Sequence, residues 1–276
     1  MSSSTRAFFA VSLVALVGAA SLHLLVLAGY GPAWSPLVHV MLFGWITGMI
    51  FAVSYHTMPV FAARDFPYPA LIWWHLATFT TGVTVSTVAL LLGGRGGIAA
   101  GLLLQLVAAL LFVANTMLLF LRGLQRAHRH PVSPIAGQER VDRLGVQATR
   151  VAALCLPLAL LLLLLLRLGW VGGGWLLAAE HLAAVGWIML MIVGVAYHVL
   201  PRFSGRSLRG VGWARLQLHC HFVALTVMIP ALGLGWTPLF AIGSVLVALA
   251  VGLFAWTIWP TVRPIQPYPP PSLPPN

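Results

Sequence analysis

Eight long apolar segments constrain this chain more than any other feature of its sequence. Each is long enough to cross a hydrocarbon core of about 30 Å, which requires about 20 helical residues. The chain is 60% hydrophobic and only 7% charged, whereas a soluble domain carries about 25% charged residues. The sequence therefore predicts an all-α integral membrane protein with eight transmembrane helices in a lipid bilayer. We place these helices at 7–29, 36–61, 69–92, 97–121, 149–169, 174–201, 212–234 and 236–259.

The arginines predict how these helices are oriented. If the N-terminus is cytoplasmic, nearly all arginines fall on the cytoplasmic side, and only Arg95 and Arg167 fall on the other. The positive-inside rule therefore predicts a multi-pass protein of the cell membrane (inner or plasma membrane) with both termini cytoplasmic. The same distribution accounts for the net charge of +11 without a nucleic-acid partner.

The second apolar segment aligns with the sixth, without a gap, when His39 is placed on His181. We call this constant offset the repeat alignment. His, Trp, Tyr and Pro recur in register, which chance matches between leucine-rich helices do not produce. We therefore predict two tandem four-helix repeats related by a pseudo-twofold axis along the membrane normal. The matched residues are His39, Gly44, Trp45, Ile46, Met49, Ile50, Val53, Tyr55, His56, Pro59 and Phe61 with His181, Gly186, Trp187, Ile188, Met191, Ile192, Val195, Tyr197, His198, Pro201 and Phe203.

The repeat divides the chain into four predicted parts. A first repeat at 1–121 is followed by a basic cytoplasmic loop at 122–148. A second repeat at 149–260 is followed by a disordered Pro-rich tail at 261–276.

Histidines within the apolar segments are the candidate site, because ionisable residues inside a membrane are costly and usually mark function. His39 and His181 occupy equivalent positions near the outer surface. If both face the pseudo-twofold axis, their imidazoles can meet and form an axial pair for a haem iron. The remaining candidates form an inner set in which one histidine of each repeat meets a neighbour on the next helix. This inner set comprises His56 with His75, and His198 with either His219 or His221.

Haem explains these widely spaced single histidines better than other metal groups do. Structural zinc requires a compact ligand set, which we do not find, whereas copper bound by clustered imidazoles stays an alternative. No Cys-x-x-Cys-His motif is present, so a haem would be non-covalent and of b, o or a type. Of these we expect haem b. Glu180, next to His181, is the one carboxylate that borders the predicted site.

The run from His181 to Arg206, with Tyr197-His198 and Pro201-Arg202-Phe203-Ser204-Gly205, resembles a helix of haem–copper oxidase subunit I. This is the superfamily of cytochrome c oxidases and nitric oxide reductases, and 39–61 is similar to the same pattern. The resemblance implies that His39 and His181 are axial ligands of a low-spin haem. The family's copper-site segments are absent, and Ala179 stands where the family has a further haem histidine. The resemblance thus implies a shortened relative without the copper site, and NnrS-type haem proteins are similar in kind.

Three functions stay open at this level. The first is a b-type haem protein that exchanges electrons with a redox partner, such as a cytochrome or a quinone, or handles nitric oxide or another haem ligand. If such a protein turns over, it is a haem-dependent oxidoreductase. The second is a membrane enzyme of the haem A synthase type, whose histidines on the fourth and eighth helices are missing here. The third is a metal or proton transporter, for which a carboxylate at the membrane midplane is missing.

Overall fold

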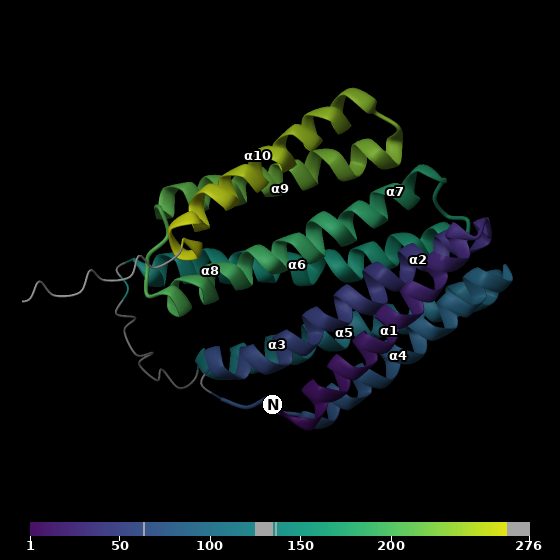
Figure 1. Cartoon of the computed structure of the whole chain (residues 1–276), viewed down its shortest axis with the longest axis horizontal. Coiled ribbons are helices and arrows are strands. Elements are labelled where there is room, and N and C mark those ends of the chain that lie inside the picture. Colours follow the sequence, from purple (N-terminus) through teal and green to yellow (C-terminus); the bar gives the residue numbers. More distant parts are fainter. Residues whose placement is uncertain (63, 125–134, 136, 264–276) are drawn as a thin grey trace, which may run out of the picture.

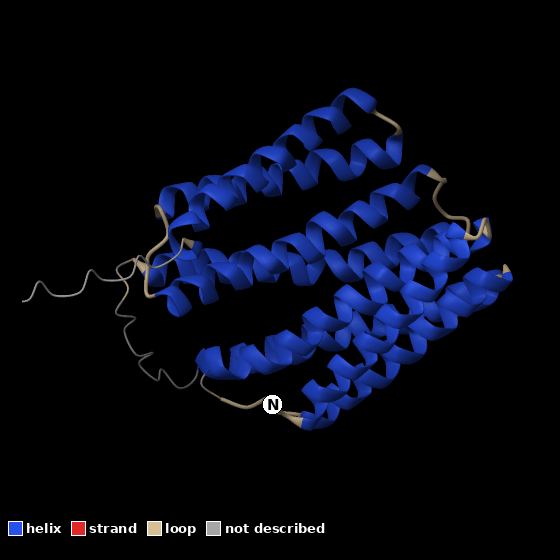
Figure 2. Ribbon diagram, viewed as in Figure 1, coloured by secondary structure: helices blue, strands red, loops and turns tan. Residues whose placement is uncertain are grey.

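The computed structural model describes residues 1–62, 64–124, 135 and 137–263, and these form helices joined by short turns and loops (Figure 2). Eight of its helical segments are long and apolar enough to cross a membrane, which confirms the predicted fold class. These spans are Ser3–Leu27, Gly31–Val60, Pro69–Leu92, Arg95–Leu121, Gln138–Arg167, Gly174–Ser204, Val211–Leu234 and Thr237–Val262.

Consecutive spans run in opposite directions, so the turns at 28–30, 93–94, 168–173 and 235–236 lie at one end of the bundle. We call this end the distal end, and the opposite end, where α1 starts and α10 finishes, the terminal end (Figure 1). The elements are α1 (Ser3–Leu27), η1 (Gly31–Ala33), α2 (Trp34–His39), η2 (Val40–Ile46), α3 (Thr47–Ala62), α4 (Pro69–Leu92), α5 (Arg95–Leu124), α6 (Gln138–Arg167), α7 (Gly174–His181), η3 (Leu182–Met189), α8 (Leu190–Ser204), α9 (Val211–Leu234) and α10 (Thr237–Val262).

Exposed tryptophans gather at both ends of the spans. This distribution is typical of the two interfaces between membrane and water, where the amphipathic indole ring lies at the level of the headgroups. It supports a bilayer around this bundle. Trp34, Trp170 and Trp236 lie at the distal end, and Trp73, Trp74, Trp213, Trp256 and Trp259 lie at the terminal end.

One predicted boundary is wrong. Helix α6 begins at Gln138 and not near 149, so the second part of the predicted loop at 122–148 is helical. A prediction based on apolar length misses the start of α6, because the residues from Gln138 onward are largely polar. Gln138, Val141 and Gly145 are nevertheless buried. The middle of the predicted loop, at 125–134, and the tail from 264 lie outside the described residues.

A π-helical segment interrupts the second span and also the sixth. These segments, η2 and η3, follow directly after His39 and His181 and start at equivalent positions of the repeat alignment, Val40 and Leu182. Because π-helical segments are rare and often mark functional sites, their recurrence beside the two outer histidines supports the predicted repeat.

Packing within the two halves also corresponds. Helix α4 packs along α5 as α9 packs along α10, and α1 packs against α3 and η2 as α6 packs against α8 and η3. The tyrosines Tyr55 and Tyr197 make corresponding hydrogen bonds to equivalent positions of the next helix, His75 and Gln217. Each half is therefore a similarly packed four-helix unit.

The described helices do not show the predicted pseudo-twofold arrangement. The halves meet mainly where α5 packs against α6, with a smaller contact between η2 and η3. A twofold axis would require α10 to pack against α1 in the same way, but these two helices form no comparable contact and lie on opposite sides of the molecule (Figure 1). We call the contact of α5 with α6 the seam.

Candidate functional site

His39 lies in a buried hydrogen-bond network near the distal end of the first half. Its Nε2 is 3.1 Å from Gln105 Nε2 and 3.1 Å from Ser86 Oγ. The Gln105 amide also donates to Ser86 Oγ over 2.6 Å. With the amide as donor, His39 Nε2 is an acceptor and Nδ1 carries the ring proton. The imidazole is therefore held in one orientation by groups from α4 and α5.

Two glycines bring these partners to His39. A Cβ on Gly101 would lie 2.5 Å from the backbone nitrogen of Ser86, and a Cβ on Gly82 would lie 2.8 Å from the backbone nitrogen of Gln105. No side chain fits at such distances, so α4 and α5 cross with their backbones almost in contact. This close crossing places the side chains of Ser86 and Gln105 together beside the His39 imidazole.

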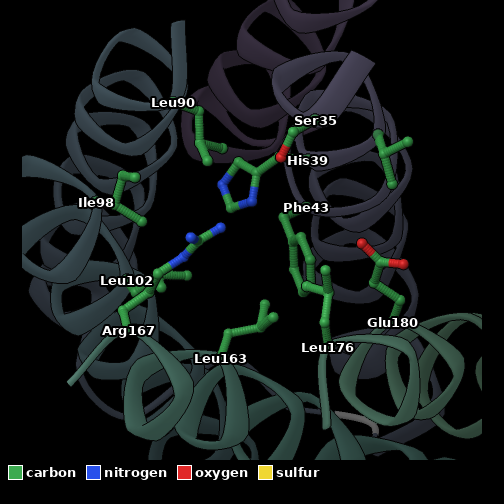
Figure 3. A pocket seen from close by; sticks show the side chains of 11 residues that line it. Ser35, His39, Phe43, Leu90, Ile98, Leu102, Leu163, Arg167, Leu176 and Glu180 are labelled. Carbon is green, nitrogen blue, oxygen red and sulfur yellow. The ribbon is translucent and has the colours of Figure 1, made fainter. Parts of the chain in front are cut away.

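A cavity of about 30 Å³ lies beside His39 at the distal end of the seam, with room for about one or two water molecules. Figure 3 shows the Arg167 guanidinium of α6 pointing toward the His39 ring, and Glu180 of α7 lines the same cavity. We call His39, Arg167 and Glu180 the distal seam site. Its other lining residues are Ser35, Val38, Phe43, Leu90, Ile98, Leu102, Leu163 and Leu176.

His181 contacts a different part of the molecule. Its Nδ1 is 2.8 Å from the Leu177 carbonyl oxygen, one turn earlier in α7. Its ring stands edge-on against Phe240 of α10, with the centroids 6.0 Å apart. The imidazole of His39 thus meets α4 and α5, and that of His181 meets α10. The predicted axial pair does not share a contact or a cavity in this structure.

The first pair of the predicted inner set is arranged differently from the expectation. His75 is fully buried, but Tyr55 is its partner, with the phenol oxygen 2.8 Å from Nδ1. His56, the neighbouring residue in sequence, is exposed. Aromatic rings pack around His75, with Phe51 and Phe8 at centroid distances of 4.3 and 5.0 Å. His75 Nε2 is enclosed without a hydrogen-bond partner.

The second pair also has partners that the sequence analysis missed. His198 Nδ1 lies 2.9 Å from an Asp142 oxygen, and Arg202 donates to both oxygens of the same carboxylate over 2.9 and 2.7 Å. His221 is buried with Nε2 3.0 Å from the Val185 carbonyl oxygen of η3, whereas His219 is exposed. As predicted, only one of these two histidines faces inward.

These contacts decide how well the site fits a metal group. Among the described residues, no group of three His, Cys, Asp or Glu side chains is placed to hold a metal ion. A haem held between His39 and His181 does not fit the arrangement, because the two rings meet different helices and the space beside His39 is far smaller than a macrocycle. Imidazole nitrogens suit iron, and guanidinium groups suit carboxylates such as a haem propionate. His39 and Arg167 supply one of each at the same apolar cavity.

The residues that the sequence analysis missed are mostly neutral and hydrogen-bonded. Ser86 and Gln105 carry no pattern that distinguishes them from other polar residues in an apolar segment. For Tyr55 and Tyr197, the repeat alignment was a signal that could have indicated their hydrogen bonds. It pairs the two tyrosines with each other, and it also pairs their partners His75 and Gln217. A scan against protein-family models gave no match, and a search of curated proteins found no significantly similar sequence.

Proposed function

We propose that this chain is a membrane protein that binds b-type haem at the distal seam site and handles a small ligand of the haem iron. His39 would hold the iron, and Arg167 would pair with a propionate. The observation that carries the proposal is that a fixed, buried imidazole and a guanidinium face one apolar cavity between the two halves.

The leucines around the cavity supply the apolar contacts that a macrocycle requires, but they fill the space in the described packing. Binding would therefore widen the seam, with Leu102 of α5 moving apart from Leu163 and Leu176 of α6 and α7. Such a widening at the distal end would keep each four-helix unit folded, because most contacts of each unit lie within it.

His39 would also have to release its present partners. Its Nε2 accepts from Gln105 and would have to be freed to hold a haem, while Ser86 and Gln105 would stay hydrogen-bonded to each other. Because the ring proton is on Nδ1, Nε2 is the nitrogen of His39 that would hold the haem. A bound haem would supply an iron that binds a small ligand, and His181 does not reach this site.

Haem titration of the purified protein tests the proposal. We expect wild type to bind haem with a Soret band, and His39→Ala to bind at least about tenfold more weakly, since even the loss of a group that only supports a metal ligand costs about 10–100-fold. His181→Ala is the matched control, because it removes the equivalent histidine of the other half, and its binding should be unchanged.

The two variants also separate this arrangement from the haem predicted from sequence, which both substitutions should abolish. The proposal would be wrong if wild type, folded in detergent or nanodiscs and offered haem, gave no Soret band. It would also be wrong if His39→Ala bound haem as tightly as wild type.

A further inference from the structure

The seam uses one face of α5 and one face of α6. Leu102 of α5 and Leu163 of α6 line the same cavity and are 2% and 5% exposed. Along α6, Leu156, Leu160 and Leu163 lie at helical spacing and are all buried, so they form one stripe. Leu163, at one end of this stripe, borders α5 at the cavity, and α5 and α6 pack along each other.

The repeat assigns a counterpart to each of these faces. The repeat alignment carries α5 onto α10 and Leu102 onto Ser244. Helices α6 and α1 are aligned through their contacts instead: a Cβ on Gly44 would meet Ala15 of α1, and a Cβ on the equivalent Gly186 would meet Cys155 of α6. With Ala15 placed on Cys155, Leu160 corresponds to Ala20, and Leu163 corresponds to His23.

These counterpart faces have no partner within the described chain. In its most apolar stretch, α5 has 39% of residues buried against 11% in α10, and α6 has 39% against 17% in α1. Ala20 and His23 are exposed, whereas their counterparts Leu160 and Leu163 are buried. The molecule therefore carries the two helix faces of a second seam on opposite sides, and the described chain does not bring these two faces together (Figure 1).

We propose that a second copy of this chain closes this gap, with α10 of one copy packed against α1 of the next as α5 packs against α6. A head-to-tail contact of this kind joins two different faces, so one chain can supply one face and its neighbour the other. The fold favours a second copy as the partner, because the seam between α5 and α6 already is a contact of this kind between the related helices. The small side chain of Ala20 on α1 would let the helices approach closely, which is how helices associate in lipid.

The docked copy would complete a site. In the seam, His39 shares a cavity with Ile98, Leu102 and Leu163. In the second half, His181 contacts Phe240, the counterpart of Ile98. Docking would add His23 of the second copy in the place of Leu163, so two imidazoles from different copies would lie near each other.

Disulfide cross-linking between two differently tagged copies in native membranes tests this arrangement. One copy carries His23→Cys and the other Ser244→Cys, both in a background where Cys220 is replaced by serine. We expect a covalent dimer that contains both tags. In the matched control, the second copy carries Leu103→Cys instead of Ser244→Cys. Leu103 lies beside Leu102 on α5, but its side chain is 51% exposed and faces away from the seam. This control pair should give no dimer.

The mass of the wild-type protein in nanodiscs supplies an independent measurement, which should correspond to two or more copies. Ala20→Trp places a large side chain on the exposed face of α1, where lipid accommodates it and a second copy does not. It should give single copies that still unfold at the wild-type temperature. If the test pair cross-links no more than the control pair and wild type has the mass of one chain, lipid covers these faces and the proposal is wrong. Docking of a second copy depends on the repeat and not on haem binding.

Discussion

At the scale of single residues, Gly101 controls the geometry of the distal seam site. Its missing side chain lets α5 touch the backbone of α4 at Ser86, and this contact places Gln105 beside His39. Gly101→Ala should lower the free energy of unfolding by about 1–3 kcal/mol, because the added methyl group forces the two backbones apart. Denaturant unfolding in detergent measures the change.

Gly96→Ala is the control for this substitution. Gly96 lies in the first turn of the same helix, and a Cβ there would meet nothing within 4 Å. Alanine is also the better helix former, so this variant should be as stable as wild type or slightly more stable. Equal losses in the two variants would show that the close approach of α4 and α5 has no special importance.

Asp142 is a second residue with a large expected effect, at the terminal end of the second half. Its carboxylate accepts hydrogen bonds from His198, Arg202 and Gln138. Because the group is about a quarter exposed, water screens part of its interaction, and Asp142→Ala should cost about 1–2 kcal/mol of unfolding free energy. Glu139→Ala, an exposed carboxylate one turn earlier, should change it by less than about 0.5 kcal/mol.

At the scale of helical elements, two hydrogen bonds through Thr47, the first residue of α3, connect the two π-helical segments. Trp187 Nε1 in η3 donates to Thr47 Oγ1 over 2.9 Å, and the Thr47 hydroxyl donates to the Leu42 carbonyl oxygen in η2. Thr47→Val should therefore cost about 1–3 kcal/mol of unfolding free energy, since it leaves the fully buried indole N–H without its acceptor. Denaturant unfolding in detergent measures this loss too.

The double variant Thr47→Val with Trp187→Phe separates this bond from other effects. If the bond itself carries the loss, removing both partners should cost less than the sum of the two single losses, because no buried donor is left unpaired. Additive losses would mean that the two side chains act independently.

The elements also show what the sequence can and cannot predict. Apolar length located the eight spans, since a bilayer imposes it directly, but it missed the polar start of α6 at Gln138. The π-helical turns were not predictable from the α-helical period, and they change the phase between His39 and His56. Burial of neutral partners such as Ser86 depends on a close helix crossing, which appears only when the helices are packed.

At the scale of the whole molecule, the matched packing of the two halves supports the predicted repeat, but their relation is an open head-to-tail contact. The polar network is not duplicated. Ser86 and Gln105 correspond to Met228 and Val247, so the second half has no equivalent of the hydrogen bonds that fix His39. The two halves share a fold, and only the first presents a fixed imidazole to the seam. This asymmetry explains why the distal seam site has one histidine.

The spin state of the haem-loaded protein tests this account most directly. With His39 as the one imidazole ligand, the ferric protein should give a high-spin electron paramagnetic resonance spectrum, and the reduced protein should bind a small ligand such as nitric oxide. His181→Ala should leave both results unchanged. A low-spin spectrum typical of two imidazole ligands, lost in His181→Ala, would contradict the account and restore the haem that the sequence predicted between His39 and His181.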